Sequence, residues 1–109
     1  LLRPFPLAVE FRHVSWDVPA LPGWAARHDL DVAGVGVPDL PTLFPAGPRV
    51  GGPRVYARLH SENPANWYAG GPARYDFDYP EATLRTWADG LRRAAAEGAE
   101  RALVFFNNC

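Results

Sequence analysis

The alternation of apolar and polar side chains is strongest between residues 54 and 60 and predicts a β-strand there. Its small and aliphatic side chains share one face, and the opposite face ends on Arg58 and His60. A charged face at the end of an apolar strand is costly unless it meets partners or lines a cleft. Further apolar runs predict three more strands, at residues 7–12, 31–37 and 102–106.

Two other segments have helical spacing. Residues 21–30 predict a short helix, and a longer one is predicted after Tyr79. The longer helix has a stripe of apolar side chains, formed by Leu84, Trp87, Ala88, Leu91, Ala94 and Ala95. We predict Asp78 as its N-cap with Glu81 as the capping-box partner, and Gly98 as its end.

The remaining residues form two long connections. Residues 38–53 contain five prolines and three glycines, which excludes a regular element. Residues 61–79 are rich in aromatic side chains. Strands that alternate with helices or long crossovers are typical of parallel βαβ units, so the sequence predicts an α/β fold.

Polar side chains follow three of the four predicted strands. Because parallel strands end at the same edge of a sheet, where α/β proteins bind ligands, we expect these side chains to converge on one site. The first strand ends with Glu10, Arg12 and His13, the third with Arg58 and His60, and the fourth with Asn107 and Asn108.

Each of these residue types suggests a role. Glu10 and His60 are candidates for proton transfer, and the two arginines, Arg12 and Arg58, for holding an anion. His13, Asn107 and Asn108 are candidates for substrate contacts, as are Trp67 and Tyr75 by stacking on a ring. The alternative is a purely structural role, in which the charged side chains pair with one another and the aromatic side chains hold a long loop against the fold.

Composition narrows the classes of partner. The 109 residues suit one domain, and a net charge of −1 gives no reason to expect nucleic acid or an anionic membrane as a partner. No apolar run is long enough to cross a membrane. The single cysteine, Cys109, allows no internal disulfide, which favours a reducing, cytoplasmic location. The histidines lack the spacing of zinc ligands, and no cofactor is indicated.

Four motifs resemble those of the YecE-like family, catalogued as domain of unknown function 72. Residues 10–16 resemble its E-x-R-h-x-S-W motif, and residues 56–60 resemble its Y-x-R-x-H-G motif. Residues 75–79, with the helix after them, resemble its Y-x-Y segment, and residues 105–108 resemble its F-F-N-N motif. The four motifs follow one another in order across nearly the whole chain.

This resemblance implies a TIM-type (β/α) barrel, of which residues 1–109 would be the C-terminal half, because a full barrel takes about 250 residues and eight strands. The absence of an initial Met also suggests a piece of a longer protein. Ser61 departs from the usual Gly, and Gly36 stands where the family often has Asp. If that Asp belongs to the site, a mechanism that needs two carboxylates is doubtful here.

The sequence therefore predicts about four parallel strands with crossover helices, as a fragment of a TIM-type barrel with a site at its C-terminal rim. Our first hypothesis is an enzyme acting on a small anionic or polyhydroxylated molecule. The alternatives are a non-catalytic ligand-binding module and a truncated fragment without activity of its own. Exposed strand edges would meet the missing N-terminal half-barrel or another copy of the chain.

Overall fold

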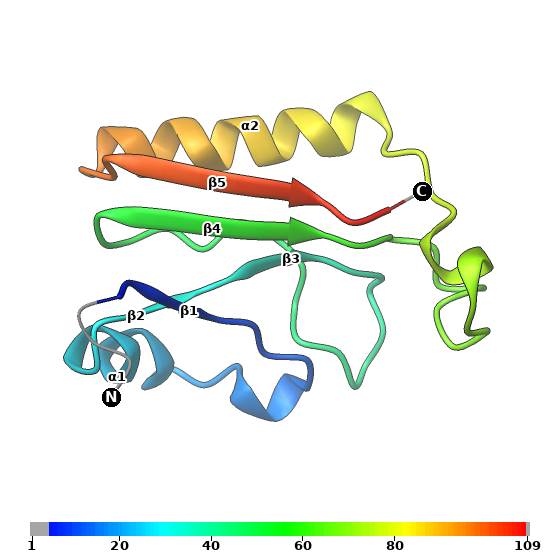
Figure 1. Ribbon diagram of the computed structural model, residues 1–109, viewed down its shortest axis with the longest axis horizontal. Helices are drawn as coiled ribbons and strands as arrows, with labels where there is room; N and C mark the ends of the chain where they lie inside the picture. Colours follow the sequence, from blue (N-terminus) through cyan, green and yellow to red (C-terminus); the bar gives the residue numbers. More distant parts are fainter. Residues whose placement is uncertain (1–4, 109) are drawn as a thin grey trace.

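The structure is a computed structural model that describes residues 5–108, so Cys109 lies outside the described part (Figure 1). In chain order its elements are β1 (Leu7–Val9), η1 (Val14–Trp16), α1 (Leu21–Arg27), β2 (Leu30–Val32), β3 (Gly34–Gly36), β4 (Arg54–Leu59), η2 (Pro72–Tyr75), α2 (Glu81–Ala96) and β5 (Arg101–Phe106). The predicted order of strands and helices is confirmed.

All paired strands are parallel, as predicted. β1 pairs with β2, and β3, β4 and β5 pair in that order. β2 and β3 are separated only by Ala33, whose N–H donates to the Val9 carbonyl at 2.9 Å. Because β2 leads into β3 past Ala33, the strands follow one another in chain order from β1 to β5. Figure 1 shows β5 beside β4. Every residue of β5 is exposed.

The first two predicted strands need correction. The strand predicted at residues 7–12 ends at Val9, and the strand predicted at 31–37 is divided at Ala33. The helix predicted at residues 21–30 ends at Arg27, because Asp29 takes a φ of 54°, a left-handed conformation that no α-helix continues. Leu30 consequently belongs to β2.

Helix α2 lies along β4 and β5 (Figure 1) and buries Trp87 against Ala57, Leu59 and Tyr79. The predicted stripe is correct at Trp87 and Ala94 but wrong at Leu84 and Ala95, which are exposed. Gly90 is buried in their place because the 38–53 connection packs closely there.

The prediction was wrong for the start of α2 and correct for its end. Pro80, extended at ψ 147°, occupies the N-cap position without a side-chain cap bond, so the prediction of Asp78 was wrong. The C-terminal stop at Gly98 is confirmed, with φ at 105°. The Ala99 N–H donates to the Ala94 carbonyl and the Gly98 N–H to the Ala95 carbonyl, which is a Schellman motif.

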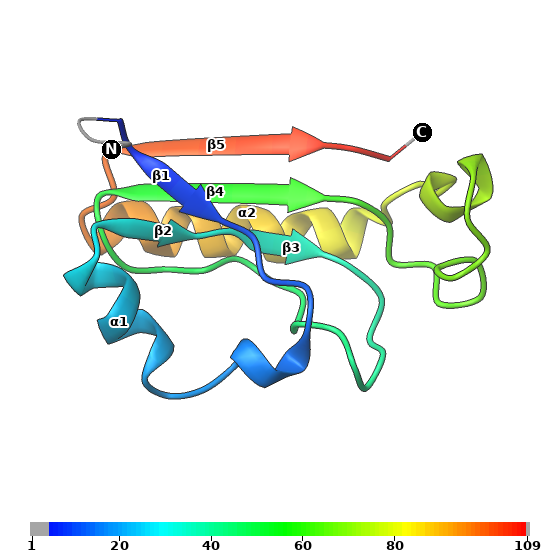
Figure 2. The same ribbon diagram turned by 60° about the horizontal axis from the view of Figure 1, so that its bottom comes forward.

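The 38–53 connection contains no helix and returns to β4 as an extended segment, as its prolines predict (Figure 2). Two glycines let it lie close to its neighbours. A Cβ at Gly34 would lie 2.7 Å from the Gly47 carbonyl oxygen, and a Cβ at Gly90 would collide with the Pro48 ring. Neither helix in the described part of the chain has the length and apolar character needed to span a bilayer.

Candidate functional site

The candidate site is built on Glu10, which directly follows β1 in the sequence. Its carboxylate meets side chains from three positions along the chain. Oε1 lies 2.7 Å from Arg12 Nε in an ion pair and 3.0 Å from His60 Nε2, and Oε2 accepts from Arg58 Nη1 at 3.0 Å. Both carboxylate oxygens are therefore occupied by nitrogen atoms of other side chains.

Asn107 extends this group from the end of β5. With the amide oriented so that its oxygen faces Arg58, Oδ1 accepts from Nε at 3.0 Å and from Nη2 at 2.6 Å. The Asn107 backbone N–H donates to the Leu59 carbonyl at 2.8 Å, which continues the β4–β5 pairing past the end of β5. We call Glu10, Arg12, Arg58, His60 and Asn107 the Glu10 cluster.

The parallel sheet explains why the cluster forms. Glu10, His60 and Asn107 follow the C-terminal ends of β1, β4 and β5, and Arg58 lies one residue before the end of β4. Strands that run in one direction bring these ends to the same edge of the sheet. Residues as far apart as 10 and 60 in the sequence therefore reach hydrogen-bonding distance.

The electrostatic surroundings keep Glu10 ionised. Burial is the largest single influence and disfavours the charged form. The hydrogen bond and charge interaction with His60, together with the charges of Arg12 and Arg58, outweigh burial, so the pKa of Glu10 lies below its ordinary value. An ionised carboxylate only accepts hydrogen bonds, so Nε2 of His60 carries the proton between them.

His60 is almost fully enclosed, with 2% of its surface exposed. Its backbone N–H donates to the Gly36 carbonyl at 2.9 Å, and its ring centroid lies 6.4 Å from that of Tyr75. Within the described residues, its Nδ1 atom is buried without a hydrogen-bond partner. A buried polar atom without a partner costs free energy and calls for an explanation.

Two of the predicted polar site residues, His13 and Asn108, lie outside the cluster. His13 is exposed and caps η1, where Nδ1 accepts from the Ser15 N–H at 3.1 Å. Asn108 donates from Nδ2 to the Phe77 carbonyl at 2.6 Å, which ties β5 to the loop before α2. Both have local partners, and neither makes a hydrogen bond to the Glu10 cluster among residues 5–108.

The aromatic loop packs on Arg74. The Arg74 guanidinium lies 4.3 Å from the ring centroid of Trp67 and 5.4 Å from that of Tyr75. Trp67 is buried in the core with Phe11 and Phe44, so it offers no open face for stacking. Tyr75 is half-buried next to His60, and it is the aromatic residue of the predicted set that reaches the cluster.

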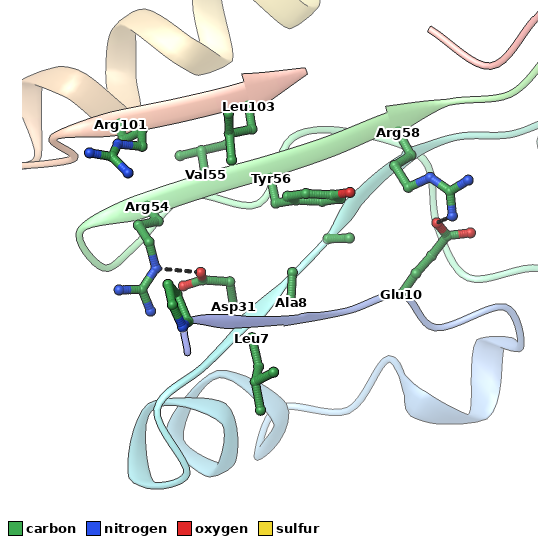
Figure 3. Close-up of a pocket in the computed structure, with 12 residues that line it drawn as sticks. Leu7, Ala8, Glu10, Asp31, Arg54, Val55, Tyr56, Arg58, Arg101 and Leu103 are labelled. Atoms are coloured by element: carbon green, nitrogen blue, oxygen red, sulfur yellow. Dashed lines mark hydrogen bonds and ion pairs between the residues drawn. The ribbon is translucent and has the colours of Figure 1, made fainter. Parts of the chain in front are cut away.

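A cavity of 340 Å³ extends from the cluster toward the N-terminal ends of the strands. Figure 3 shows Glu10 and Arg58 turned toward each other at one end, and Arg54 bonded to Asp31 at the other. Arg54 Nε donates to Asp31 Oδ2 at 2.7 Å, and Tyr56 lies between the two ion pairs. Glu10 and Arg58 are the cluster residues that border this cavity.

Our sequence reasoning did not identify the second ion pair. Arg54 and Tyr56 precede Arg58 at intervals of two, and this alternation was the available signal that they share its face. Asp31 carried no such signal, because its distance from Arg54 depends on the sheet register. Within residues 5–108, no three His, Cys, Asp or Glu side chains are grouped so that they could hold a metal ion.

The position of Gly36 bears on the departure from the resembled motif. A Cβ at Gly36 would lie 2.5 Å from the Tyr79 hydroxyl oxygen and 3.0 Å from the Leu59 Cα atom. A carboxylate at this position would require Tyr79 to move. Glu10 is consequently the carboxylate of the cluster in this chain.

Comparison with known proteins finds a family and solved structures. The model of the family described as protein of unknown function DUF72 matches residues 1–109. A DUF72 family protein of Thermotoga maritima MSB8 is 37% identical, with a TM-score of 0.86, and the match covers 97% of this chain and 40% of that one. No curated protein matches the chain.

Two crystal structures of a DUF72 family protein from Enterococcus faecalis V583 share the fold. Each is 24% identical, with TM-scores of 0.78 and 0.80. The matches cover 97% of this chain, and 43% and 42% of theirs. The chain therefore spans about two fifths of the length of these solved structures.

Proposed function

The chain belongs to the DUF72 family of unknown function. Starting from that membership, we propose that the complete protein is an enzyme and that its Glu10 cluster binds a small anionic substrate. The single observation that carries the proposal is that Arg12 and Arg58 share one carboxylate, Glu10. Two guanidinium charges against one carboxylate leave an excess of positive charge, even with His60 neutral. An anionic ligand would balance it.

The hydrogen-bonding inventory favours an anion over a polyhydroxylated molecule. Both oxygens of Glu10 are occupied, and the Asn107 oxygen faces Arg58. Within residues 5–108, the groups without a partner on the accessible side of the cluster are donors, namely the Nη atoms of Arg12 and the Asn107 Nδ2 group, whereas the acceptor His60 Nδ1 is buried. Sugar hydroxyls need acceptors as well as donors, whereas a carboxylate or phosphate takes donors alone.

Arg12 is the better candidate for direct contact with the ligand. Its side chain is 52% exposed and its Nε pairs with Glu10, and within residues 5–108 its Nη atoms form no hydrogen bond. Arg58 is held by Glu10 on one side and Asn107 on the other. We therefore assign Arg12 to ligand binding, and Arg58 with Glu10 to positioning.

Proton transfer is assigned to His60. The ionised Glu10 holds the Nε2–H, which leaves Nδ1 of a neutral ring with the lone pair that a general base needs. The lowered pKa of Glu10 makes it a poor proton donor near neutral pH. Of the two residues that the sequence suggested for proton transfer, Glu10 and His60, we therefore keep His60.

The burial of His60 favours a second candidate, a binding module without catalysis. Nδ1 is enclosed beside Tyr75, so a substrate would reach it only after a shift of the 61–79 loop. If that loop stays in place, the cluster binds an anion and transfers no proton.

We interpret the fold as part of a TIM-type barrel. The support is a row of parallel strands with α2 along β4 and β5, and relatives about two and a half times as long. The exposed β5 edge would then pair with the remaining part of the barrel, or with a second copy when that part is absent.

The test uses the full-length natural protein and calorimetric titration with inorganic phosphate. Arg12→Ala should weaken binding by about ten- to a hundredfold, since a charge-assisted hydrogen bond contributes about 1.5–3 kcal/mol. Arg85→Ala is the matched control, because Arg85 pairs with Glu81 on the exposed face of α2. Equal affinity in both variants would contradict the proposal.

Turnover is tested separately, by screening phosphorylated and carboxylated metabolites. His60→Asn should keep phosphate affinity and lose any turnover that the screen finds. Retained turnover in this variant would remove His60 from the mechanism, and binding without turnover in the natural protein would favour the binding module.

A further inference from the structure

A second cavity, of 520 Å³, lies away from the Glu10 cluster. Its walls come from α1, β2, the 48–52 segment and Arg93 near the end of α2. The apolar part of the wall includes Leu21, Leu30, Val32 and Val50. No residue of the Glu10 cluster lines it, although the Arg54–Asp31 pair borders both cavities.

The cavity exists because the β3–β4 connection has no helix. In a regular βαβ unit, a helix would fill the space between α1 and α2. Here the prolines keep the connection extended, and Pro48 packs on Gly90 instead. Gly51 and Gly52, which also line the cavity, have positive φ values, and a Cβ on either would meet no atom within 4 Å.

Three arginines border this apolar hollow, and they differ in their partners. Arg54 is held by Asp31 at 2.7 Å and Asp29 at 3.7 Å. Arg49 has a distant partner, Asp17 at 3.6 Å, and lies 4.2 Å from the Phe44 ring centroid.

Of these three arginines, Arg93 is the one whose positive charge is balanced least by nearby carboxylates. Its neighbour Arg92 pairs with Asp89 at 2.7 Å. In the described part of the chain, no carboxylate lies within ion-pair distance of Arg93. A positive charge is favourable in the last turn of α2 because of the helix dipole. The helix dipole does not explain why this charge borders an apolar cavity.

We infer that this cavity binds a small anion with an apolar body, such as an alkyl or aryl carboxylate. The volume falls within the range of small-molecule sites, which are mostly apolar with a few placed polar groups. The apolar body would lie against Leu21, Leu30 and Val50. Arg93 and Arg49 would face the charged group, since guanidinium matches carboxylate in geometry and charge.

The test is calorimetric titration of the full-length natural protein with octanoate, octan-1-ol and acetate. Octanoate should bind saturably, octan-1-ol about tenfold more weakly, and acetate should not displace octanoate, because the site needs both an apolar body and a charge. Equal affinity for octanoate and octan-1-ol would overturn the inference, as would the absence of saturable octanoate binding.

Two neighbouring arginines give a matched pair of variants. Arg93→Gln should weaken octanoate affinity about tenfold. Arg92→Gln should change octanoate affinity less than about twofold, because the natural Arg92 already pairs with Asp89. Equal effects of the two substitutions would overturn the assignment of Arg93. Arg12→Ala should leave octanoate affinity unchanged, which separates this site from the Glu10 cluster.

Discussion

Glu10 Oε1 and His60 Nε2 lie 3.0 Å apart, although the two residues are 50 positions apart in the sequence. The carboxylate that holds the imidazole also holds two guanidinium groups. One side chain at the end of β1 thus sets the positions of groups from β4 and, through Arg58, of Asn107 after β5. The same carboxylate therefore holds the polar groups at this edge of the sheet together.

Glu10→Gln is expected to destabilise the fold by about 2 kcal/mol. The substitution removes the negative charge from a part-buried group that holds Arg58 and His60, and uncompensated buried charge is costly. Urea denaturation at neutral pH measures the change. Asp89→Asn is the control, since the exposed Asp89–Arg92 pair should contribute less than about 0.5 kcal/mol. Equal losses would mean that the Glu10 cluster adds nothing to stability.

The contribution of Glu10 should disappear in acid. Its folded-state pKa is lower than the ordinary value of 4.5, so the unfolded chain takes up the proton first. The stabilisation is present above that ordinary value and is lost as the pH falls through the folded-state pKa. The gap in unfolding free energy between the natural protein and Glu10→Gln should shrink below pH 4.5. A gap that stays constant on acidification would contradict this.

Glu62 should show the opposite pH dependence. Burial raises its pKa above 4.5, so the folded state favours the protonated form. Its contribution is fully present below the ordinary value and is lost as the pH rises through the raised pKa. Glu62→Gln should therefore be more stable than the natural protein at pH 7 and similar to it at pH 4, as measured by urea denaturation. Lower stability at pH 7 would show that the charged form is needed.

Gly90→Ala should destabilise the protein by about 1–3 kcal/mol. The added Cβ would collide with the Pro48 ring, and the 38–53 connection would have to move away from α2. Gly23→Ala in α1 is the control, because a Cβ there meets only Arg27 Nη1 at 3.6 Å, and alanine favours a helix. Thermal unfolding should show a lower Tm for the first variant and an unchanged or higher Tm for the second.

Residues 1–109 expressed alone should self-associate through β5. The strand is exposed along its whole length, including Leu103 at 45% and Phe106 at 57%, and an unpaired apolar edge invites pairing with another chain. Leu103→Lys should shift the mass measured by light scattering toward the monomer. Leu84→Lys, on the exposed surface of α2, is the control and should leave the mass unchanged. A monomer at all concentrations would contradict the prediction.

Local signals explain which elements were predictable. The alternation in β4 and the glycine after α2 were read correctly because strand period and helix termination depend on neighbouring residues. The N-cap prediction was wrong because both Asp78 and Pro80 are compatible with a helix start. The extended conformation of Pro80 makes it the N-cap of α2. Gly90 was missed because only the return of the 38–53 segment makes a missing side chain an advantage.

The sequence by itself determined an α/β chain whose strands end on Glu10, Arg58, His60 and Asn107, because periodicity places side chains on faces and prolines end elements. The tertiary structure alone decided which of those side chains meet. His13 bonds to Ser15, Asn108 bonds to Phe77, and Asp31 pairs with Arg54. His60 is buried, with the Tyr75 ring of the 61–79 loop 6.4 Å from its own. Such pairings depend on strand register and loop packing, which arise from contacts between residues tens of positions apart.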